Sequence, residues 1–303
     1  MSVPTCYFLL PKMDTLASHL SSLVSIGIAT KNRWSDLQIT LTKLVEASLD
    51  LPIIIFDDAS DTPCPFDLTA FPFTNLEFQT FPNSQGYIVR RNQIAEKIQT
   101  KYYLSLDDDS YPVTGNLEEA IAFAEAQEDL LCLSFPIYNP VQQQYENKSL
   151  QATPYLVRSF IGCGHLLHRD RFLDLGRYRA ELIHQGEEME LAARAFQQDL
   201  SCYHFPNFTI HHTASNQGRN WWRMDFYGSR NNVLWNDWFV PQRLKVIKQI
   251  RTLVSRLIIS LKVRRSGLIR GEIAGFSQIN QYKSNRHNMS YTYFNKWKKL
   301  PHS

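Results

Sequence analysis

Two groups of acidic side chains come directly after apolar runs of the sequence. Asp57 and Asp58 follow Pro52–Phe56, and the triplet Asp107-Asp108-Asp109 follows Tyr102–Leu106. Acids that are crowded together repel one another unless a cation or a hydrogen-bonding ligand compensates their charge. One carboxylate of the triplet can hold a hard divalent cation while another reaches a ribose hydroxyl or a metal-bound water. Although Asp is also common in turns and at helix caps, two such groups one crossover apart favour a metal and nucleotide site.

Candidates for a general base and for a further metal ligand stand later in the chain. Glu187, Glu188 and Glu190 open a predicted helix, where the helix dipole favours acids for structural reasons as well. A carboxylate whose pKa is raised by neighbouring acids is a suitable general base. His211 and His212 end a predicted strand. Neighbours on a strand face opposite sides, so at most one of these histidines can enter a given site.

The apolar periodicity predicts the elements that position these residues. Val24–Thr30 and Pro52–Phe56 are aliphatic runs typical of strands buried on both faces, and Ser35–Ser48 between them has helical spacing. The same strand, helix and strand unit recurs over residues 76–106. A helix over Leu117–Ala126, approached through Pro112 and Gly115, and a strand over residues 130–135 come next. Ligands of such open α/β sheets bind beyond the carboxyl ends of the strands, which is where the acids lie.

After about residue 140 the pattern loosens. A glycine-rich segment, Gly162-Cys163-Gly164, precedes a predicted helix from Glu187 to Gln198, and an aromatic-rich helix is predicted over Trp221–Trp238. Pro241 is the predicted boundary before a basic tail. The expected division is an N-terminal extension over residues 1–21, a catalytic domain over 22–240 and a basic, partly amphipathic tail over 241–303.

Composition narrows the class of protein. The 303 residues are 44% hydrophobic and 13% aromatic, which allows a sizeable core and argues against disorder. The five cysteines are far apart and form no C-x-x-C pair, so we expect neither a zinc knuckle nor a disulfide framework, and a reducing, cytoplasmic compartment fits. We expect neither a signal peptide nor a membrane-spanning segment.

The charge is distributed unevenly. The net charge is +3, yet the segment from Gln242 onward holds fourteen Lys and Arg and a single acid, Glu272. Leu244, Ile247, Ile250 and further apolar residues up to Leu261 recur at three- and four-residue steps with Lys and Arg between them. This pattern predicts a basic amphipathic helix that lies on an anionic membrane surface or packs its apolar stripe on the catalytic domain. Nucleic-acid binding is not expected, because no recognised motif is present and the rest of the chain is acidic.

The motifs, taken in order, resemble glycosyltransferase family 2, the inverting enzymes with the GT-A fold. Val24–Arg33 is similar to the first strand and donor-binding loop of that family, and Ile55–Ser60 to its second-strand motif. Asn83, Gly86, Arg91 and Asn92 are similar to its N-x-x-G…R-N pattern. Leu106–Asp109 resembles the Asp-x-Asp signature, and the resemblance covers about residues 22–240.

Later motifs resemble the same family. Gly162-Cys163-Gly164 is similar to its glycine-rich acceptor segment, and Gly186–Leu191 with Arg194 to its E-D-x-D-L-x-x-R motif. Glu stands where the family has an Asp at the base position, so Glu187 rivals Glu188 for that role. The implied fold is α/β: a GT-A type, Rossmann-like mixed sheet flanked by helices, here followed by the basic helical tail.

The resemblance implies a metal-dependent transfer of a sugar from a nucleotide-sugar donor to an acceptor hydroxyl, with inversion, in surface polysaccharide or glycoconjugate synthesis. The expected base is Glu188, and the expected cation is Mn²⁺ or Mg²⁺. The remaining expected site residues fall into three sets: donor-binding Thr30, Asn32, Arg33, Asp58, Arg91, Asn92, Asp107 and Asp108; metal-binding Asp107, Asp109 and His211, with His212 as its rival; and acceptor-side Gly162, Gly164, Trp221 and Trp222.

The expected partners are a nucleotide sugar, a carbohydrate or lipid-linked acceptor and an anionic membrane surface, with the protein cytoplasmic or peripheral on the inner membrane face. Two other functions stay open. A non-catalytic carbohydrate-binding or scaffold protein would be expected to lose the Asp triplet or the Glu pair, and both are intact. A sugar-phosphate nucleotidyltransferase would need a glycine-rich loop after the first strand, and residues 30–34 contain no glycine.

Overall fold

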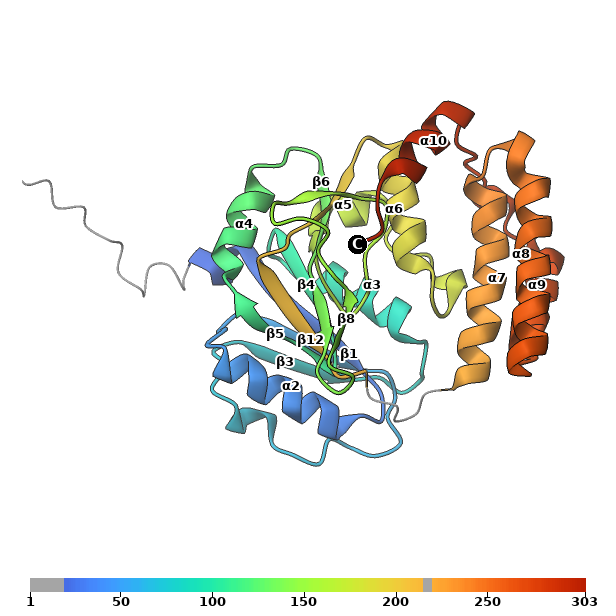
Figure 1. Ribbon diagram of the computed structural model, residues 1–303. Helices are drawn as coiled ribbons and strands as arrows, with labels where there is room; N and C mark the ends of the chain where they lie inside the picture. The colour runs from blue at the N-terminus through green and yellow to red at the C-terminus, as the bar shows by residue number, and fades with distance from the viewer. Residues whose placement is uncertain (1–18, 215–219) are drawn as a thin grey trace, which may run out of the picture.

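A computed structural model describes residues 19–214 and 220–303 of the chain. Most of the expected N-terminal extension therefore lies outside the described residues. Figure 1 shows a central sheet with helices on both sides and a group of long helices at one edge of the molecule. The mixed α/β architecture expected from the sequence is confirmed.

The first half of the large sheet is parallel. Its strands are β1 (Val24–Thr30), β2 (Ile53–Asp57), β3 (Leu76–Thr80) and β4 (Tyr102–Asp107), and they lie in the order β3-β2-β1-β4. All the side chains of β1 and β2 except Ala29 are buried, as continuous aliphatic runs predict. The crossovers run through helices α2 (Trp34–Glu46) and α3 (Tyr87–Lys97) and the short 3₁₀ turn η1 (Leu68–Ala70). These crossovers bring the carboxyl ends of β1 and β4 to the same edge of the sheet.

The second half of the large sheet is mixed. Strand β10 (Gly164–His168) lies antiparallel between β4 and β6 (Leu130–Ser134), and β11 (Ser201–His204) and β9 (Tyr155–Val157) complete the described sheet. Its helices are α4 (Leu117–Glu125), α5 (Arg169–Asp174) and α6 (Glu187–Gln197), with the 3₁₀ turn η2 (Ala180–Leu182) before α6. Because β10 pairs with β4, the glycine-rich segment before it ends beside the Asp triplet.

A smaller sheet closes the other side of the triplet. It contains β5 (Ser110–Gly115), β12 (Phe208–His212), β7 (Ile137–Asn139) and β8 (Gln144–Asn147), in the order β5-β12-β7-β8. Pro112 and Gly115, which precede the helix over Leu117–Glu125, belong to a strand paired with β12 that the sequence did not predict. Pairing of His212 with Ser110 places this histidine next to the turn that carries Asp109.

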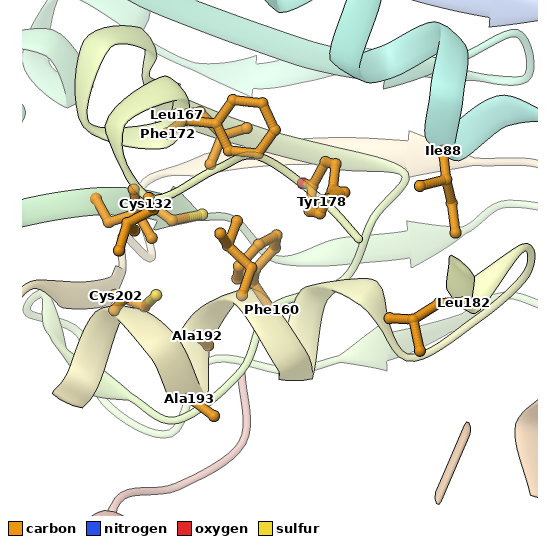
Figure 2. Close-up of a cluster of buried hydrophobic side chains, with 14 of the residues drawn as sticks. Ile88, Cys132, Phe160, Leu167, Phe172, Tyr178, Leu182, Ala192, Ala193 and Cys202 are labelled. Carbon is orange, nitrogen blue, oxygen red and sulfur yellow. The ribbon is translucent and has the colours of Figure 1, made fainter. Parts of the chain in front are cut away.

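A hydrophobic core holds α6 against the sheet. Figure 2 shows Ala192 of α6 near Phe160 and Cys202, with Ala193 pointing away from them and with Tyr178 and Phe172 on the other side of the cluster. The helix is buried on more than one side, and Leu191, Ala193 and Ala195 have no exposed surface. Small side chains let the helix approach the strands closely, and this packing fixes where its first turn, which carries Glu187 and Glu188, must lie.

Long helices follow the small sheet. They are α7 (Trp221–Phe239), α8 (Gln242–Val263) and α9 (Gly267–Gln278). Three glycines of α9, spaced four residues apart, lie very close to α7. A Cβ added at Gly267 would lie 2.8 Å from the Trp222 carbonyl oxygen, and one added at Gly271 would lie 2.2 Å from the Phe226 carbonyl oxygen. A Cβ added at Gly275 would lie 2.7 Å from the Val233 side chain. The two helices therefore pack backbone to backbone.

The end of the chain returns to the part of the molecule that precedes Pro241. After the 3₁₀ turn η3 (Lys283–Asn285), helix α10 (Tyr291–Lys299) buries Phe294 and Trp297, and the ring of Trp297 lies 5.1 Å from that of Trp235 on α7. Residues after Pro241 thus share a core with residues before it. Among the described helices, none combines the length and the apolar character needed to cross a bilayer.

Candidate active site

A cleft of about 690 Å³ opens at the carboxyl ends of β1 and β4. Its walls come from the Asp triplet, the loop after β1, the glycine-rich segment, the first turn of α6, the end of β12 and the first turn of α7. The structure brings together twelve of the expected site residues here: Thr30, Asn32, Arg33, Asp58, Arg91, Asp107, Asp108, Asp109, Gly162, Glu187, Glu188 and His212. The expected position at the carboxyl edge of the sheet holds.

The middle aspartate of the triplet is buried and held from several sides. The Thr30 hydroxyl donates to Asp108 Oδ2 (2.8 Å), and Arg33 lies 3.1 Å from Asp108 Oδ1. The Thr40 hydroxyl of α2 donates to the Asp108 carbonyl (2.8 Å), which fixes the turn itself. Burial raises the pKa of Asp108 to about 8, although Arg33 opposes the rise. These contacts hold the turn in place, and Arg33 compensates the charge of Asp108.

Asp109 lies between Arg33 and the end of β12. Its carboxylate pairs with the Arg33 guanidinium, and its Oδ1 is 3.4 Å from His212 Nε2. Burial alone would raise the pKa of Asp109, but His212 and Arg33 together lower it below the ordinary value. Burial likewise opposes protonation of His212, yet its contacts with Cys163 and Asp109 raise the pKa of the imidazole well above its ordinary value. A positive charge at this position is thus favoured.

The residues around His212 fit a divalent cation. One ligand atom each from Asp107, Asp109 and His212 lies within 4.8 Å of the others. Two carboxylates and an imidazole form a donor set that suits Mn²⁺ and also accepts Mg²⁺. Glu146, Cys163 and His212 form a second group within the same distance, and the Glu146 carboxylate lies 2.8 Å from His212 Nδ1. Glu146 therefore orients the imidazole so that its other nitrogen faces Asp109.

The two histidines at the end of β12 face opposite sides of their strand. His211 stacks among aromatic rings, 5.2 Å from Tyr138 and 5.8 Å from Tyr111 between ring centroids, and is not among the residues that line the cleft. The structure therefore places His212, the rival candidate, beside the Asp triplet. The alternation of side chains along a strand restricts the site to one of the two, and the pairing register with β5 selects which.

Asp58, at the end of β2, is almost saturated by hydrogen bonds. It accepts from the Ser84 hydroxyl (2.6 Å), from the backbone N–H groups of Gln85 and Gly86 (both 2.8 Å) and from Arg90 Nε (2.7 Å). Burial alone would raise the pKa of Asp58, but these donors lower it. Asp58 therefore holds the loop before α3 in place, and it also lines the cleft. Sequence reasoning missed Arg90, which a buried acid one crossover away could have indicated.

One of the cleft residues, Asn32, is tied to a neighbouring loop, and two other expected residues, Asn92 and Gly164, do not line the cleft. Asn32 lies in the loop after β1 with a positive φ of 58°, and its side chain exchanges hydrogen bonds with Asp61. Asn92 points away from the cleft, where its amide bonds to the backbone N–H and carbonyl of Tyr178. Gly164 lies inside β10 against Ile210 and leaves no room for a Cβ. Asn92 and Gly164 thus support the walls of the cleft from behind.

The first turn of α6, called the facing wall below, carries the glutamate pair. Glu187 is completely buried, and the side chain of Glu188 is 18% exposed to the cleft. Both face Arg91 Nη1, at 3.5 Å from Glu187 and 4.0 Å from Glu188, while the same guanidinium pairs with Asp107. Burial raises the pKa of Glu187, and burial together with the charge of Glu187 raises that of Glu188. A raised pKa makes a carboxylate a stronger base.

Contacts made by Gly162 and Asn231 fix the position of Glu188 in the cleft. Gly162 lies directly opposite it: a Cβ there would approach Glu188 Oε1 to 2.1 Å, so only glycine leaves room for the carboxylate. On the other side, the Asn231 amide of α7 donates to the carbonyls of Leu182, His184 and Gln185, which precede α6. Asn231 therefore holds the loop that leads into the glutamate pair.

The first turn of α7 contributes residues that sequence reasoning missed. Asn220, Arg223 and Met224 line the cleft, whereas Trp221 and Trp222 lie outside it beside Arg264 and Arg265. Helical spacing explains the difference, since side chains at successive positions point in different directions. Lys31, Ser84, Tyr87 and His184 also line the cleft without having been expected. Tyr87 could have been found, because it stands four residues before Arg91 on the same face of α3.

Comparison with known proteins identifies relatives of the chain. The family model described as Glycosyl transferase family 2 matches residues 25–181, more than half of the chain. Pre-mycofactocin glycosyltransferase of Mycobacterium tuberculosis is 25% identical over 221 residues, which are 68% of this chain and 46% of that protein. The chain thus spans less than half the length of the curated relatives it matches.

Solved structures show the same fold at low sequence identity. The mannosyltransferase PcManGT from Pyrobaculum calidifontis, in complex with GDP-Man and Mn²⁺, superposes with a TM-score of 0.54 at 13% identity and covers 91% of this chain and 78% of its own. GalNAc-T7 with UDP, GalNAc and Mn²⁺ gives 0.53 at 16% identity, with 69% and 50% covered. The family match shows that the chain belongs to glycosyltransferase family 2, and the solved structures show that it has the GT-A fold.

Proposed function

We propose that this glycosyltransferase transfers a sugar from a nucleoside-diphosphate sugar to an acceptor hydroxyl, with a divalent cation and with inversion at the anomeric carbon. One observation carries the proposal. A single cleft gathers a carboxylate and imidazole donor set on one wall and, on the facing wall, a glutamate whose pKa is raised. An in-line displacement needs these two groups on opposite sides of the reacting carbon.

The structural neighbours support the choice of donor and cation. PcManGT was solved with GDP-Man and Mn²⁺, and TarS of Staphylococcus aureus, with a TM-score of 0.52 at 12% identity over 91% of this chain and 79% of its own, was solved with UDP-GlcNAc. By analogy with these proteins, we propose that this chain binds a nucleotide sugar together with Mn²⁺ or Mg²⁺.

On the donor wall, Asp107, Asp109 and His212 would hold the cation. When bound, the cation supplies positive charge that stabilises the diphosphate as it leaves. Arg33, which pairs with Asp108 and Asp109, is placed to turn its guanidinium toward the diphosphate once those carboxylates are otherwise compensated. Thr30, Asn32, Asp58 and Asp108 form the rest of the proposed nucleotide side.

On the facing wall, Glu188 would accept the proton of the attacking hydroxyl. Its side chain reaches the cleft, whereas Glu187 is completely buried behind it. Glu187 then raises the basicity of Glu188 by its charge, and Arg91 keeps both side chains in place. The remaining space beside Gly162, Asn220 and Arg223 is the proposed acceptor side. Trp221 and Trp222, expected there from the sequence, lie outside the cleft and are not part of the proposed acceptor side.

We further propose a cytoplasmic location and a role in surface polysaccharide or glycoconjugate synthesis. Among the described cysteines, Cys64, Cys132, Cys163 and Cys202 are free thiols, which fits a reducing compartment.

The proposal is tested by donor binding and turnover. UDP or GDP with Mn²⁺ should raise the melting temperature, by the equivalent of about 2.7 kcal/mol at a hundredfold excess over the dissociation constant. A panel of nucleotide sugars should yield one donor that is hydrolysed slowly without an acceptor, and NMR of an early time point should show the inverted anomer. Retention of configuration, or no stabilisation by any nucleotide diphosphate, would contradict the proposal.

A further inference from the structure

Helix α8 rests on its neighbours through polar side chains. Lys245 pairs with Asp237 of α7 (3.1 Å), and the Gln249 amide donates to the Val233 carbonyl (2.9 Å). One and two turns further on, Thr252 lies 3.4 Å from the Asn236 amide and Arg256 acts electrostatically on buried Glu272 of α9. These positions, three or four residues apart, form a single stripe that faces the protein.

The opposite stripe of α8 is apolar and exposed. Val246, Ile247 and Ile250 are 67%, 59% and 56% exposed, and Leu261 is 72% exposed. The large exposed side chains of this helix are, in order, Val246, Ile247, Ile250, Leu253, Val254, Leu257, Ile258, Ile259, Leu261 and Val263. A soluble helix that packed by the usual rule would turn these residues inward, so the apolar stripe is built to contact something outside the described chain.

Charge indicates what covers this stripe. Exposed basic residues flank it along the whole helix, namely Arg243, Lys248, Arg251, Lys262 and Arg264. Helix α8 contains no Asp or Glu. A second copy of the helix would bring cations against cations without an acid to pair with, whereas an anionic lipid surface offers both apolar chains and negative headgroups.

The segment just after α8 lies against two exposed tryptophans of α7. Trp221 and Trp222 are 52% and 45% exposed, and Arg265, just after α8, lies over the Trp221 ring at 5.3 Å. Both tryptophans belong to the first turn of α7, whose other side lines the cleft through Arg223 and Met224. Tryptophan and arginine are typical of the boundary between lipid headgroups and acyl chains. Figure 1 shows α7, α8 and α9 side by side at one edge of the molecule.

We propose that α8 lies flat on an anionic bilayer, with its apolar stripe among the acyl chains and with Trp221 and Trp222 at the headgroup layer. This attachment places the first turn of α7, and with it the acceptor side of the cleft, next to the membrane. Membrane attachment does not depend on the proposed transferase activity. If that activity holds, the acceptor is a molecule held in that membrane.

The test is co-sedimentation of the full chain with vesicles. Vesicles of phosphatidylcholine with phosphatidylglycerol should pull the protein down at about 0.05 M salt, and binding should fall several-fold at about 0.5 M salt. Phosphatidylcholine alone should bind weakly. Replacing Ile250, Val254 and Leu257 together by Ser should lower vesicle affinity by about tenfold or more. The double variant Lys248→Gln, Arg251→Gln should weaken binding to the anionic vesicles but not to phosphatidylcholine vesicles. Its binding should also depend less on salt concentration.

The matched control is Ile39→Ser on α2, since Ile39 is 50% exposed and lies away from α8. It should bind vesicles like the wild type. Circular dichroism and donor hydrolysis should be unchanged in the triple variant, which separates failure of the surface from failure of the proposed chemistry. The proposal is overturned if the wild type stays in the supernatant with every vesicle, or if light scattering shows a dimer that the triple variant dissociates while vesicle binding is absent.

Discussion

The two walls of the cleft differ in how their carboxylates are compensated. On the donor wall, Asp58 accepts four hydrogen bonds, and Asp109 is paired with both Arg33 and His212. On the facing wall, Glu187 is completely buried and its ion pair with Arg91 is long, at 3.5 Å, while Glu188 is 4.0 Å from the same guanidinium. The pKa values of Asp58 and Asp109 are accordingly lowered, and those of both glutamates are raised.

This difference separates binding from proton transfer. A carboxylate with a lowered pKa stays ionised and is suited to hold a cation or to fix a loop. A carboxylate with a raised pKa gains basicity and is suited to accept a proton. Apart from buried Asp108, whose pKa is raised although it lies on the donor wall, the electrostatics divide the work of the cleft between its walls, and the following variants test that division.

The largest effect is expected from Glu188→Gln. The amide cannot accept the acceptor proton, so kcat should fall by about 10²–10⁴ while donor binding stays the same. Single-turnover kinetics and nucleotide titration measure the two quantities separately. Glu187→Gln is the control, and it should retain more activity. If Glu187→Gln shows the larger loss of kcat, the two residues exchange roles.

On the donor wall, Asp109→Asn should remove Mn²⁺-dependent nucleotide binding. Losing a direct ligand should cost more than the ~10–100-fold in metal affinity that is typical of losing an outer-shell partner. Isothermal titration of UDP or GDP with and without Mn²⁺, and with chelator, gives the measurement. Glu146→Gln, which changes only the partner of His212, should have the smaller effect. Nucleotide binding that is equally strong with and without metal in the wild type would break the assignment of this wall.

Gly162→Ala should act on the facing wall through steric contact alone. The new methyl group would meet Glu188 Oε1, and a displacement of about 1 Å can cost up to about 10² in rate. The change should appear in kcat and leave nucleotide affinity intact. In a Glu188→Gln background the same substitution should add little, because both act through one carboxylate. Additive losses would show that Gly162 acts on something else.

The pH dependence should report the raised pKa of the glutamate pair. The base must be ionised, so activity should fall as the pH drops through the raised pKa, by about tenfold per pH unit below it. That limb should lie above the ordinary glutamate value of about 4.3. The profile of kcat/KM for a soluble acceptor, with Mn²⁺ held saturating, gives the apparent value for the pair. A limb at the ordinary carboxyl value would remove the contrast between the walls.

The smallest effect is expected from Ser84→Ala. It removes one of the donors to Asp58 and leaves Gln85, Gly86 and Arg90 in place, so the free energy of unfolding should fall by about 1 kcal/mol. Urea denaturation measures this change, with nucleotide affinity expected to stay within twofold to threefold, or about 0.6 kcal/mol. A large loss of nucleotide affinity would show that the Ser84 hydroxyl itself contacts the donor.

The parallel half of the fold was predictable because burial on both faces leaves a clear signal. Val24–Thr30 and Ile53–Asp57 are continuous aliphatic runs, and the acids that follow them meet at one edge whatever the details of the crossovers. The mixed half was harder. Strand β5 contains Pro112, and β10 begins with a glycine, so neither reads as a strand without its partner.

Within the site, the types of the residues could be predicted from the sequence, but the directions in which their side chains point could not. The His211-His212 pair limits the site to one histidine, but the pairing of His212 with Ser110 decides which one, and this register comes from tertiary structure. The same holds for Trp221 and Trp222, because only the packing of α7 on α9 fixes which side of its first turn faces the cleft.

The three glycines of α9 have a consequence for how the protein tolerates sequence change. Because Gly267, Gly271 and Gly275 touch the backbone and Val233 of α7, even an alanine there must separate the two helices. Helix α7 carries both Arg223 at the cleft and Asn231 behind the glutamate pair, so such a separation would be transmitted to the proposed acceptor side and to the glutamate pair. Substitutions in a surface loop are tolerated easily. The contact between α7 and α9 should instead be nearly as intolerant of substitution as the residues that meet the substrate.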